Sequence, residues 1–278
     1  MDTASGRTRL RALTALVALA LATPASADQL RITVTSGQPA GGFAFSPVWV
    51  GLHDGTFASF TPGAAASPGI RAVAELGDSS AISAEFAGHG PQTTVGSAPI
   101  TPGGSASTTL DIADPSTHRF LSFASMVVPS NDFFFGNADP TAFSLFDASG
   151  AYQGDRTIQI FGRNAWDAGT EVNDVDFGSA FIVGANAGDH TAENGTVGLV
   201  FGGPNDHTAY LNSILGRATP GGYAISHLIS ADDLIATIRI TAVPEPSSLA
   251  LCGIGVVGLW IVGRRARKSR PSNVSAPA

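Results

Sequence analysis

The stretch Leu30-Arg31-Ile32-Thr33-Val34-Thr35 alternates between apolar and polar residues, and this pattern decides the fold class. The same alternation recurs in Thr157-Ile158-Gln159-Ile160 and in Thr237-Ile238-Arg239-Ile240-Thr241. Successive side chains of a strand point to opposite faces of a sheet, so a period of two indicates one packed face and one solvated face. Their β-branched residues also favour strands. All three stretches are therefore predicted to be strands, with the half-solvated character typical of antiparallel sheets.

Four more segments of the chain have strand composition: residues 107–112, 119–128, 143–146 and 196–201. Clusters of turn residues separate them, such as Asp147-Ala148-Ser149-Gly150. Residues 67–87 depart from this pattern, because their apolar positions suit one or two short helices with Asp78 or Ser79 as an N-cap. Seven or more short strands with such punctuation predict an all-β fold, an antiparallel β-sandwich with one or two short helices at its edge.

The N-terminal segment has the organisation of an export signal. Three arginines precede an apolar run at residues 12–22, and small residues up to Ala27 form an A-x-A cleavage site. An ordinary buried helix is the alternative, but it would need a polar periodicity that this run lacks. Residues 1–27 are therefore predicted to be a signal peptide, with the mature chain starting at Asp28.

The C-terminal segment combines three elements in a fixed order. Val243-Pro244-Glu245-Pro246 precedes an apolar run at residues 249–263, and a cluster of arginines and one lysine follows. The run of 15 residues is shorter than the roughly 20 of a comfortable membrane span. The basic cluster would keep this end on the cytoplasmic side. A membrane anchor before any processing is the expectation for residues 243–270, followed by a disordered tail at 271–278.

This order of Pro-Glu-Pro, apolar helix and arginines resembles the PEP-CTERM sorting signal of Gram-negative bacteria that produce exopolysaccharide. The resemblance implies processing by a membrane protease of the exosortase type. It also implies a final location at the cell surface or in the extracellular matrix, with the membrane contacted only through this tail. A plain C-terminal anchor is the alternative.

The region between the two ends, residues 28–243, is strongly acidic. It holds seven arginines, no lysine and 20 of the 22 acidic residues, which gives a net charge of −13. Such a surface repels nucleic acid and suits divalent cations, although solubility outside the cell also accounts for much of the charge. The single cysteine, Cys252, lies in the tail, so the ectodomain has no disulfide.

No catalytic motif is present in the sequence. Serine-hydrolase, zinc-protease and phosphate-loop signatures are absent, and six histidines are scattered without ligand spacing. A triad assembled from unpatterned residues would escape this test. The expectation is a protein that is not an enzyme.

One segment concentrates carboxylates. Asp167-Ala168-Gly169-Thr170-Glu171 places two acidic residues four apart around a glycine, and Asn173, Asp174 and Asp176 follow. Carboxylates that converge in a loop repel unless a cation such as Ca²⁺, which takes six to eight oxygens, lies between them. The spacing is not that of an EF-hand. A solvated acidic loop without metal is the alternative.

Several motifs along residues 30–177 resemble the spondin N-terminal domain family. The clearest are Ser125-Met126-Val127-Val128-Pro129-Ser130-Asn131-Asp132-Phe133-Phe134 and Asp167-Ala168-Gly169-Thr170-Glu171. Phe45-Ser46-Pro47, residues 57–63 and residues 72–78 also fit bacterial members. The resemblance implies a β-sandwich that binds Ca²⁺ between loops at one end. Carried over by motif, it implies the metal ligands Asp132, Asp167 and Glu171, with Glu171 standing where aspartate is frequent.

These features lead to one function hypothesis and its rivals. We expect an exported Ca²⁺-binding surface or matrix protein that is adhesive or structural in biofilm or exopolysaccharide, with polysaccharide or a surface protein as its partner. The alternatives are a secreted hydrolase of extracellular polysaccharide, which needs two carboxylates in a cleft, and an inert spacer. The aromatic run at residues 133–135 is either a ligand-contacting loop tip or, more in keeping with its apolar character, a core strand.

Overall fold

The structure is a computed structural model, and it describes residues 29–243. The predicted signal peptide, the sorting tail beyond Val243 and the predicted disordered end lie outside the described residues. No helix among residues 29–243 has both the length and the apolar character to cross a membrane.

The first sheet contains the three alternating stretches as neighbours. Its order is β5–β1–β11–β8, all antiparallel, with β1 at Gln29–Ser36 and β11 at Leu234–Ala242. β5 spans Ser105–Asp111 and β8 spans Arg156–Phe161. In β1 every second side chain is buried, as the alternation predicts. The prediction of strands in these segments is therefore confirmed.

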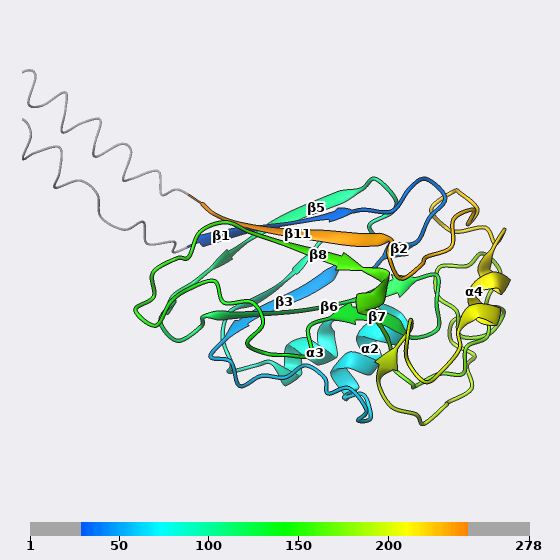
Figure 1. Cartoon of the computed structure of the whole chain (residues 1–278), viewed down its shortest axis with the longest axis horizontal. Coiled ribbons are helices and arrows are strands. Elements are labelled where there is room, and N and C mark those ends of the chain that lie inside the picture. Colours follow the sequence, from blue (N-terminus) through cyan, green and yellow to red (C-terminus); the bar gives the residue numbers. More distant parts are fainter. Residues whose placement is uncertain (1–28, 244–278) are drawn as a thin grey trace, which may run out of the picture. The chain divides into compact units, whose positions relative to one another are not determined.

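The second sheet has seven strands and carries the more fully buried segments. Along its main path the order is β10–β9–β7–β6–β3–β4, and β2 (Ala44–Phe45) pairs with β6. The other strands are β3 (Val48–His53), β4 (Gln92–Val95), β6 (Phe120–Val128), β7 (Phe133–Gly136), β9 (Ala165–Asp167) and β10 (Gly198–Leu199). The two antiparallel sheets form the predicted β-sandwich-like fold, drawn as an upper and a lower layer in Figure 1.

The main core lies between the sheets. Leu30, Ile32 and Val34 of β1 are fully buried and belong to the same apolar cluster as Phe133 and Phe135 of β7. Phe133–Phe135 are at most 1% exposed, which confirms the core interpretation of this aromatic run. Complete burial of such side chains contributes about 1.5–3 kcal/mol each.

Two helices form within residues 67–87, as predicted, and they cover the outer face of the second sheet rather than the edge of the sandwich. α2 (Pro68–Leu76) starts after Ser67, whose hydroxyl oxygen accepts a hydrogen bond from the Ile70 N–H. α3 (Ser80–Glu85) follows, and a second apolar cluster around Trp49 and Phe86 lies beneath the helices. Figure 1 shows both helices below β3 and β6.

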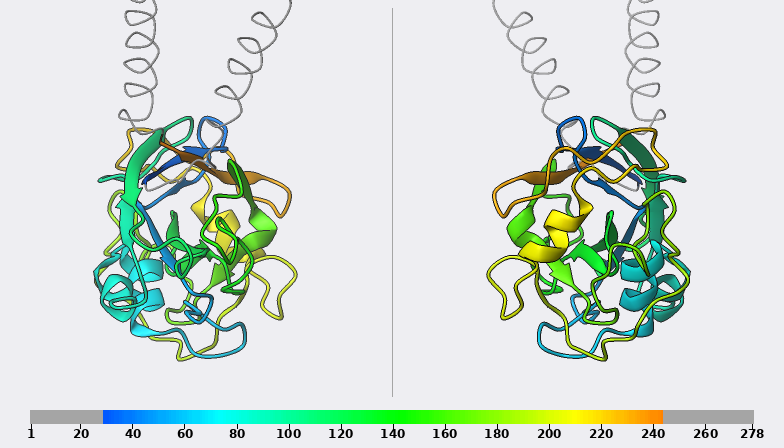
Figure 2. Two further views of the ribbon diagram at one scale, coloured as in Figure 1. Left: turned by 90° about the vertical axis from the view of Figure 1, so that its left-hand side faces the viewer. Right: turned by 90° about the vertical axis from the view of Figure 1, so that its right-hand side faces the viewer.

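Three further segments differ from the sequence prediction. Residues 143–146 form only isolated bridges, and residues 196–201 contribute only the two residues of β10. A third helix, α4 (Thr208–Ile214), was not predicted and lies at the end of the sandwich that faces the reader in the right panel of Figure 2. Its buried Tyr210, Leu211 and Ile214 show that it closes the core there.

Candidate metal centre

Strand pairing brings two of the predicted site residues together. β7 begins at Phe133, directly after Asp132, and β9 ends at Asp167, the register partner of Phe133. The chain continues this pairing beyond the strands, because the Ala168 N–H donates to the Asp132 carbonyl over 3.1 Å. Asp132, just before β7, and Asp167, at the end of β9, therefore lie at the same end of two neighbouring strands.

The Asp132 carboxylate is buried and only half satisfied. Its Oδ2 accepts hydrogen bonds from the Thr170 N–H (2.7 Å), the Thr170 hydroxyl (3.1 Å) and the Glu171 N–H (3.1 Å). Its Oδ1 has no hydrogen-bond partner among the described residues. Because a buried carboxylate oxygen without a donor costs free energy, Oδ1 is an atom that a bound cation would stabilise.

Asp167 is equally buried and lies in a polar surrounding. The Gly169 N–H donates to its Oδ1 (2.7 Å), and the Asn173 side-chain amide donates to its Oδ2 (3.0 Å). His207 Nδ1 lies 3.6 Å from the same Oδ2. Asn173 Oδ1 and His207 Nε2 are themselves buried without partners within residues 29–243. Two acceptor oxygens without donors in this part of the chain, Asp132 Oδ1 and Asn173 Oδ1, thus belong to the Asp132–Asp167 surrounding.

Within residues 29–243, no arginine or lysine forms an ion pair with either carboxylate of this pair. Burial and the adjacent Asp167 carboxylate together raise the pKa of Asp132 well above its usual range, despite the hydrogen bonds from residues 170 and 171. Two carboxylates in this position repel unless a proton or a cation is shared between them. The donor set is mostly oxygen, which is the chemistry that hard cations such as Ca²⁺ take.

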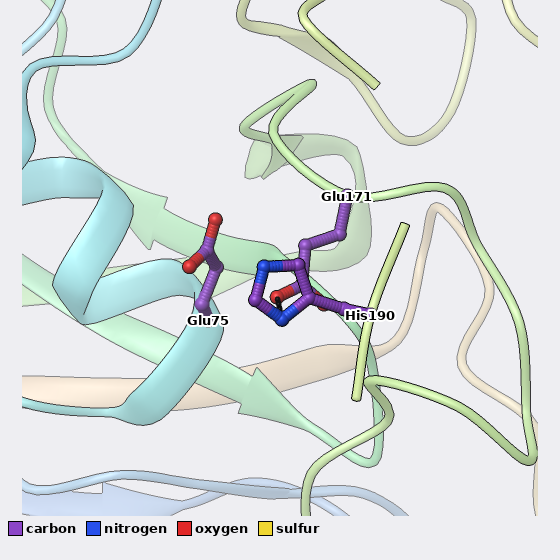
Figure 3. Close-up of side chains that lie close together, drawn as sticks. All are labelled: Glu75, Glu171 and His190. Atoms are coloured by element: carbon purple, nitrogen blue, oxygen red, sulfur yellow. Dashed lines mark ion pairs between the residues drawn. The ribbon is translucent and has the colours of Figure 1, made fainter. Parts of the chain in front are cut away.

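The Glu171 side chain lies in a second cluster. Its Oε1 is 3.2 Å from His190 Nδ1, and Glu75 of α2 completes a group whose ligand atoms all lie within 4.8 Å of one another. Figure 3 shows Glu75 and His190 approaching Glu171 from two other segments of the chain. This Glu75–Glu171–His190 centre is the one group of three such side chains that the described residues place this close, and it could hold a metal ion.

The electrostatics of Glu171 reflect this surrounding. Burial, followed by the charge of Glu75, raises the pKa of Glu171 to about 7, against the opposing effects of His190, the Asn131 amide and Arg71. Gly178 has a φ of +80° and lies so close that a Cβ there would meet Glu171 Oε2 at 2.7 Å. The carboxylate is therefore held tightly by the surrounding chain.

The three predicted ligands are thus divided by the direction of their side chains. Asp132 and Asp167 form one pair, and Glu171 joins it through its backbone N–H while its carboxylate faces Glu75 and His190. Their sharing of one ion stays a prediction. Glu75, His190 and His207 were not recognised from the sequence, whereas Asn173 was noted among the polar residues that follow the loop. Glu75 lies on a helix and His190 in a loop 19 residues after Glu171, so no ligand spacing in the sequence could reveal them.

Fold and site together define a class: an acidic β-sandwich domain with buried carboxylate loops at one end. Comparison with protein families identifies it further. The Spondin_N model matches residues 36–180, a little more than half of the 278-residue chain, so the protein belongs to the Spondin_N family. The PEP-CTERM protein-sorting motif matches residues 242–268 and implies exosortase processing, export and sorting to the cell surface. A comparison with curated proteins finds no significant match.

Proposed function

We propose that this Spondin_N protein is a non-enzymatic surface or matrix protein that binds Ca²⁺ through its 132 and 167–171 loops. It acts in adhesion or in the structure of biofilm and exopolysaccharide, with a polysaccharide or a surface protein as its partner. The sorting motif at residues 242–268 and the acidic, lysine-free ectodomain support this role.

The observation that carries the proposal is the Asp132–Asp167 pair. Both side chains are buried, Asp132 Oδ1 and Asn173 Oδ1 have no donors among the described residues, and Asp167 lies close enough to raise the Asp132 pKa. An ion between the loops would satisfy these oxygens and replace the repulsion with attraction. Asp132 and Asp167 would hold it, and calcium would then act by fixing the 167–171 loop for contact with a partner.

The hydrolase alternative needs a different arrangement. Two carboxylates would have to face a sugar-sized cleft about 5–10 Å apart. Asp167 and Glu171 are 3% and 1% exposed, and neither lines the cavity of about 570 Å³ beside α4. Its acidic lining residues Asp174, Glu193 and Asp206 come from separate loops. No geometry among the described residues favours the hydrolase over the binding protein.

Thermal unfolding of the purified full chain in mild detergent tests the calcium proposal. At calcium 100-fold above its Kd, binding adds about 2.7 kcal/mol, which raises Tm by about 5–10 °C over the protein in chelator. The Asp132→Asn variant should lose this shift, because it removes one of the two carboxylates that would hold the ion. Asp155→Asn, which changes an exposed carboxylate, should keep the shift. Identical curves with millimolar calcium and with chelator would remove the calcium claim.

A further inference from the structure

We propose that Glu75, Glu171 and His190 bind a second divalent ion of the first-row transition-metal class, with Zn²⁺ as the reference ion, in a site separate from the proposed calcium site. This inference does not rest on the calcium proposal. It gives Glu171 two roles, because its N–H supports the Asp132 carboxylate and its side chain ligates the second ion.

The convergence of the three residues is a product of the tertiary fold. Glu75 comes from the last turn of α2, Glu171 from the loop after β9, and His190 from a loop that returns to it. The return of that loop is fixed by the backbone, since Glu171 and Ala192 form a β-bridge and the Val172 N–H donates to the Thr191 carbonyl over 2.8 Å. The ligand atoms meet within 4.8 Å although 115 residues separate the first from the last.

The two buried carboxylates of this centre favour the binding of a cation. Glu75 and Glu171 are 6% and 1% exposed, and each carboxylate faces the other's charge. Arg71 reaches only Oε1 of Glu75, at 2.8 Å, and its own side chain is half-exposed. No second arginine or lysine within residues 29–243 forms an ion pair with either glutamate. A divalent ion would neutralise both carboxylates at once, which a neutral histidine does not do.

The donor set selects the class of ion. An imidazole nitrogen suits Zn²⁺, Fe²⁺, Ni²⁺ or Cu²⁺, whereas Ca²⁺ prefers a shell made only of oxygen. One histidine and two carboxylates supply three ligands, the number that zinc sites with an open fourth position use. The His190 side chain is 29% exposed, so solvent reaches this side of the centre and an ion can enter there.

A metal at this position would link three segments of the chain. It would join α2 on the outer face of the second sheet to the 168–175 loop and to the 186–193 loop. The Glu171–His190 contact already aligns two of the ligands without the ion. Metal binding would then displace the proton between them, as deprotonated ligands require.

The test is a zinc titration of the full chain, purified without a histidine tag and stripped with chelator, in competition with a chromophoric zinc indicator. We expect one equivalent of Zn²⁺ with a submicromolar Kd that millimolar Ca²⁺ does not displace. His190→Gln should weaken zinc binding by more than about 100-fold, because the loss of an outer-shell partner alone costs about 10–100-fold. X-ray absorption should show one imidazole and oxygen ligands, with no sulfur.

Matched variants separate this site from general effects and from the calcium proposal. His227→Gln removes another histidine that contacts a carboxylate, Asp233 at 3.2 Å, and should leave zinc binding unchanged. Asp132→Asn should lose the calcium shift and keep zinc. Zinc binding that survives in His190→Gln, that falls equally in His227→Gln, or that calcium displaces at comparable concentration would overturn the proposal. Because the His190 side chain is partly exposed, His190→Gln should fold normally. The melting temperature of the metal-free variant verifies this.

Discussion

The two carboxylate clusters share the loop at residues 167–171, and their charges have different partners. At the Asp132–Asp167 pair, backbone and side-chain donors from residues 169–173 surround oxygen ligands, and one carboxylate oxygen is left without a donor. At the Glu75–Glu171–His190 centre, a histidine and an arginine contact the carboxylates. The first surrounding suits a hard ion bound by oxygens, and the second suits an ion that accepts nitrogen.

One residue, Glu171, belongs to both clusters. The Glu171 N–H serves Asp132, while its carboxylate serves Glu75 and His190. A metal bound at one cluster would therefore act on the backbone that supports the other. The clusters are expected to be coupled in stability even if they bind different ions.

The largest expected effect comes from Asn131, which precedes Asp132 in the chain and whose side-chain amide donates to Glu171 Oε2 over 3.5 Å. Its Oδ1 accepts from the Tyr210 hydroxyl (2.7 Å), the Ser179 hydroxyl (2.9 Å) and the Asp174 N–H (3.1 Å), and its amide donates to the Phe177 carbonyl (2.8 Å). Asn131→Ala should lower the free energy of unfolding by about 3–5 kcal/mol, because these buried groups lose their partner. Denaturant unfolding measures this loss.

Asn137→Ala is the matched control, since Asn137 is also buried and bridges strands of the same sheet through the Phe123 N–H and the Leu121 carbonyl. It should cost a similar amount and leave both metal affinities intact. If Asn131→Ala also binds both ions normally, Asn131 stabilises the fold without organising the clusters, and the coupling between them fails.

A smaller effect is expected at Gly178, which touches only the second cluster. A Cβ there would approach Glu171 Oε2 at 2.7 Å and the Asn131 amide nitrogen at 2.5 Å, in a residue with a φ of +80°. Gly178→Ala should therefore destabilise the protein by about 2–3 kcal/mol and weaken zinc binding more than calcium binding.

Gly184 is the control for Gly178, because its substitution adds backbone strain without a steric clash. Its φ is +86°, but no atom lies within 4 Å of a Cβ placed there. Gly184→Ala should cost only about 1–2 kcal/mol from backbone strain, measured by the same unfolding experiment. Equal losses in both variants would show that Glu171 and Asn131 can move aside, against the tightly held carboxylate described above.

The sequence predicted the fold where solvent exposure alternates. The stretches at residues 30–35, 157–160 and 237–241 became three adjacent strands, β1, β8 and β11, because one face of their sheet is solvated. β3 was not predicted, because all six of its residues are buried and no alternation remains. Residues 143–146 were overpredicted, because their apolar side chains enter the core from a loop.

The sequence predicted the site only in part. Asp132, Asp167 and Glu171 were found through motifs, and the strand register explains why the first two meet. The direction of the Glu171 side chain depends on α2 and on the 186–193 loop, which no local pattern connects to it. His190 and Glu75 could therefore be recognised only in three dimensions.

The smallest expected effect is a change of stability with pH that both clusters share. Burial raises the pKa of Glu171 to about 7, and the pKa of Asp132 shifts in the same direction. The metal-free folded state then holds protons that the unfolded state has released, so the free energy of unfolding falls as pH rises through 7. Between pH 6.5 and 8 the loss should be on the order of 1–2 kcal/mol, measured by urea unfolding in chelator.

His53 changes stability with pH in the opposite direction, but most of its titration lies below this pH window. Burial lowers the pKa of His53 to about 4, so this histidine destabilises the folded state as pH falls below about 6.5 and contributes little to the pH dependence above it. Glu171→Gln should reduce the pH slope and Asp155→Asn should not. Saturating metal should remove this slope, because metal-bound carboxylates are deprotonated in the folded state as they are in the unfolded state. A metal-free protein whose stability is flat or rises between pH 6.5 and 8 would mean that these carboxylates are already ionised and compensated within the chain, and neither cluster would then need an ion.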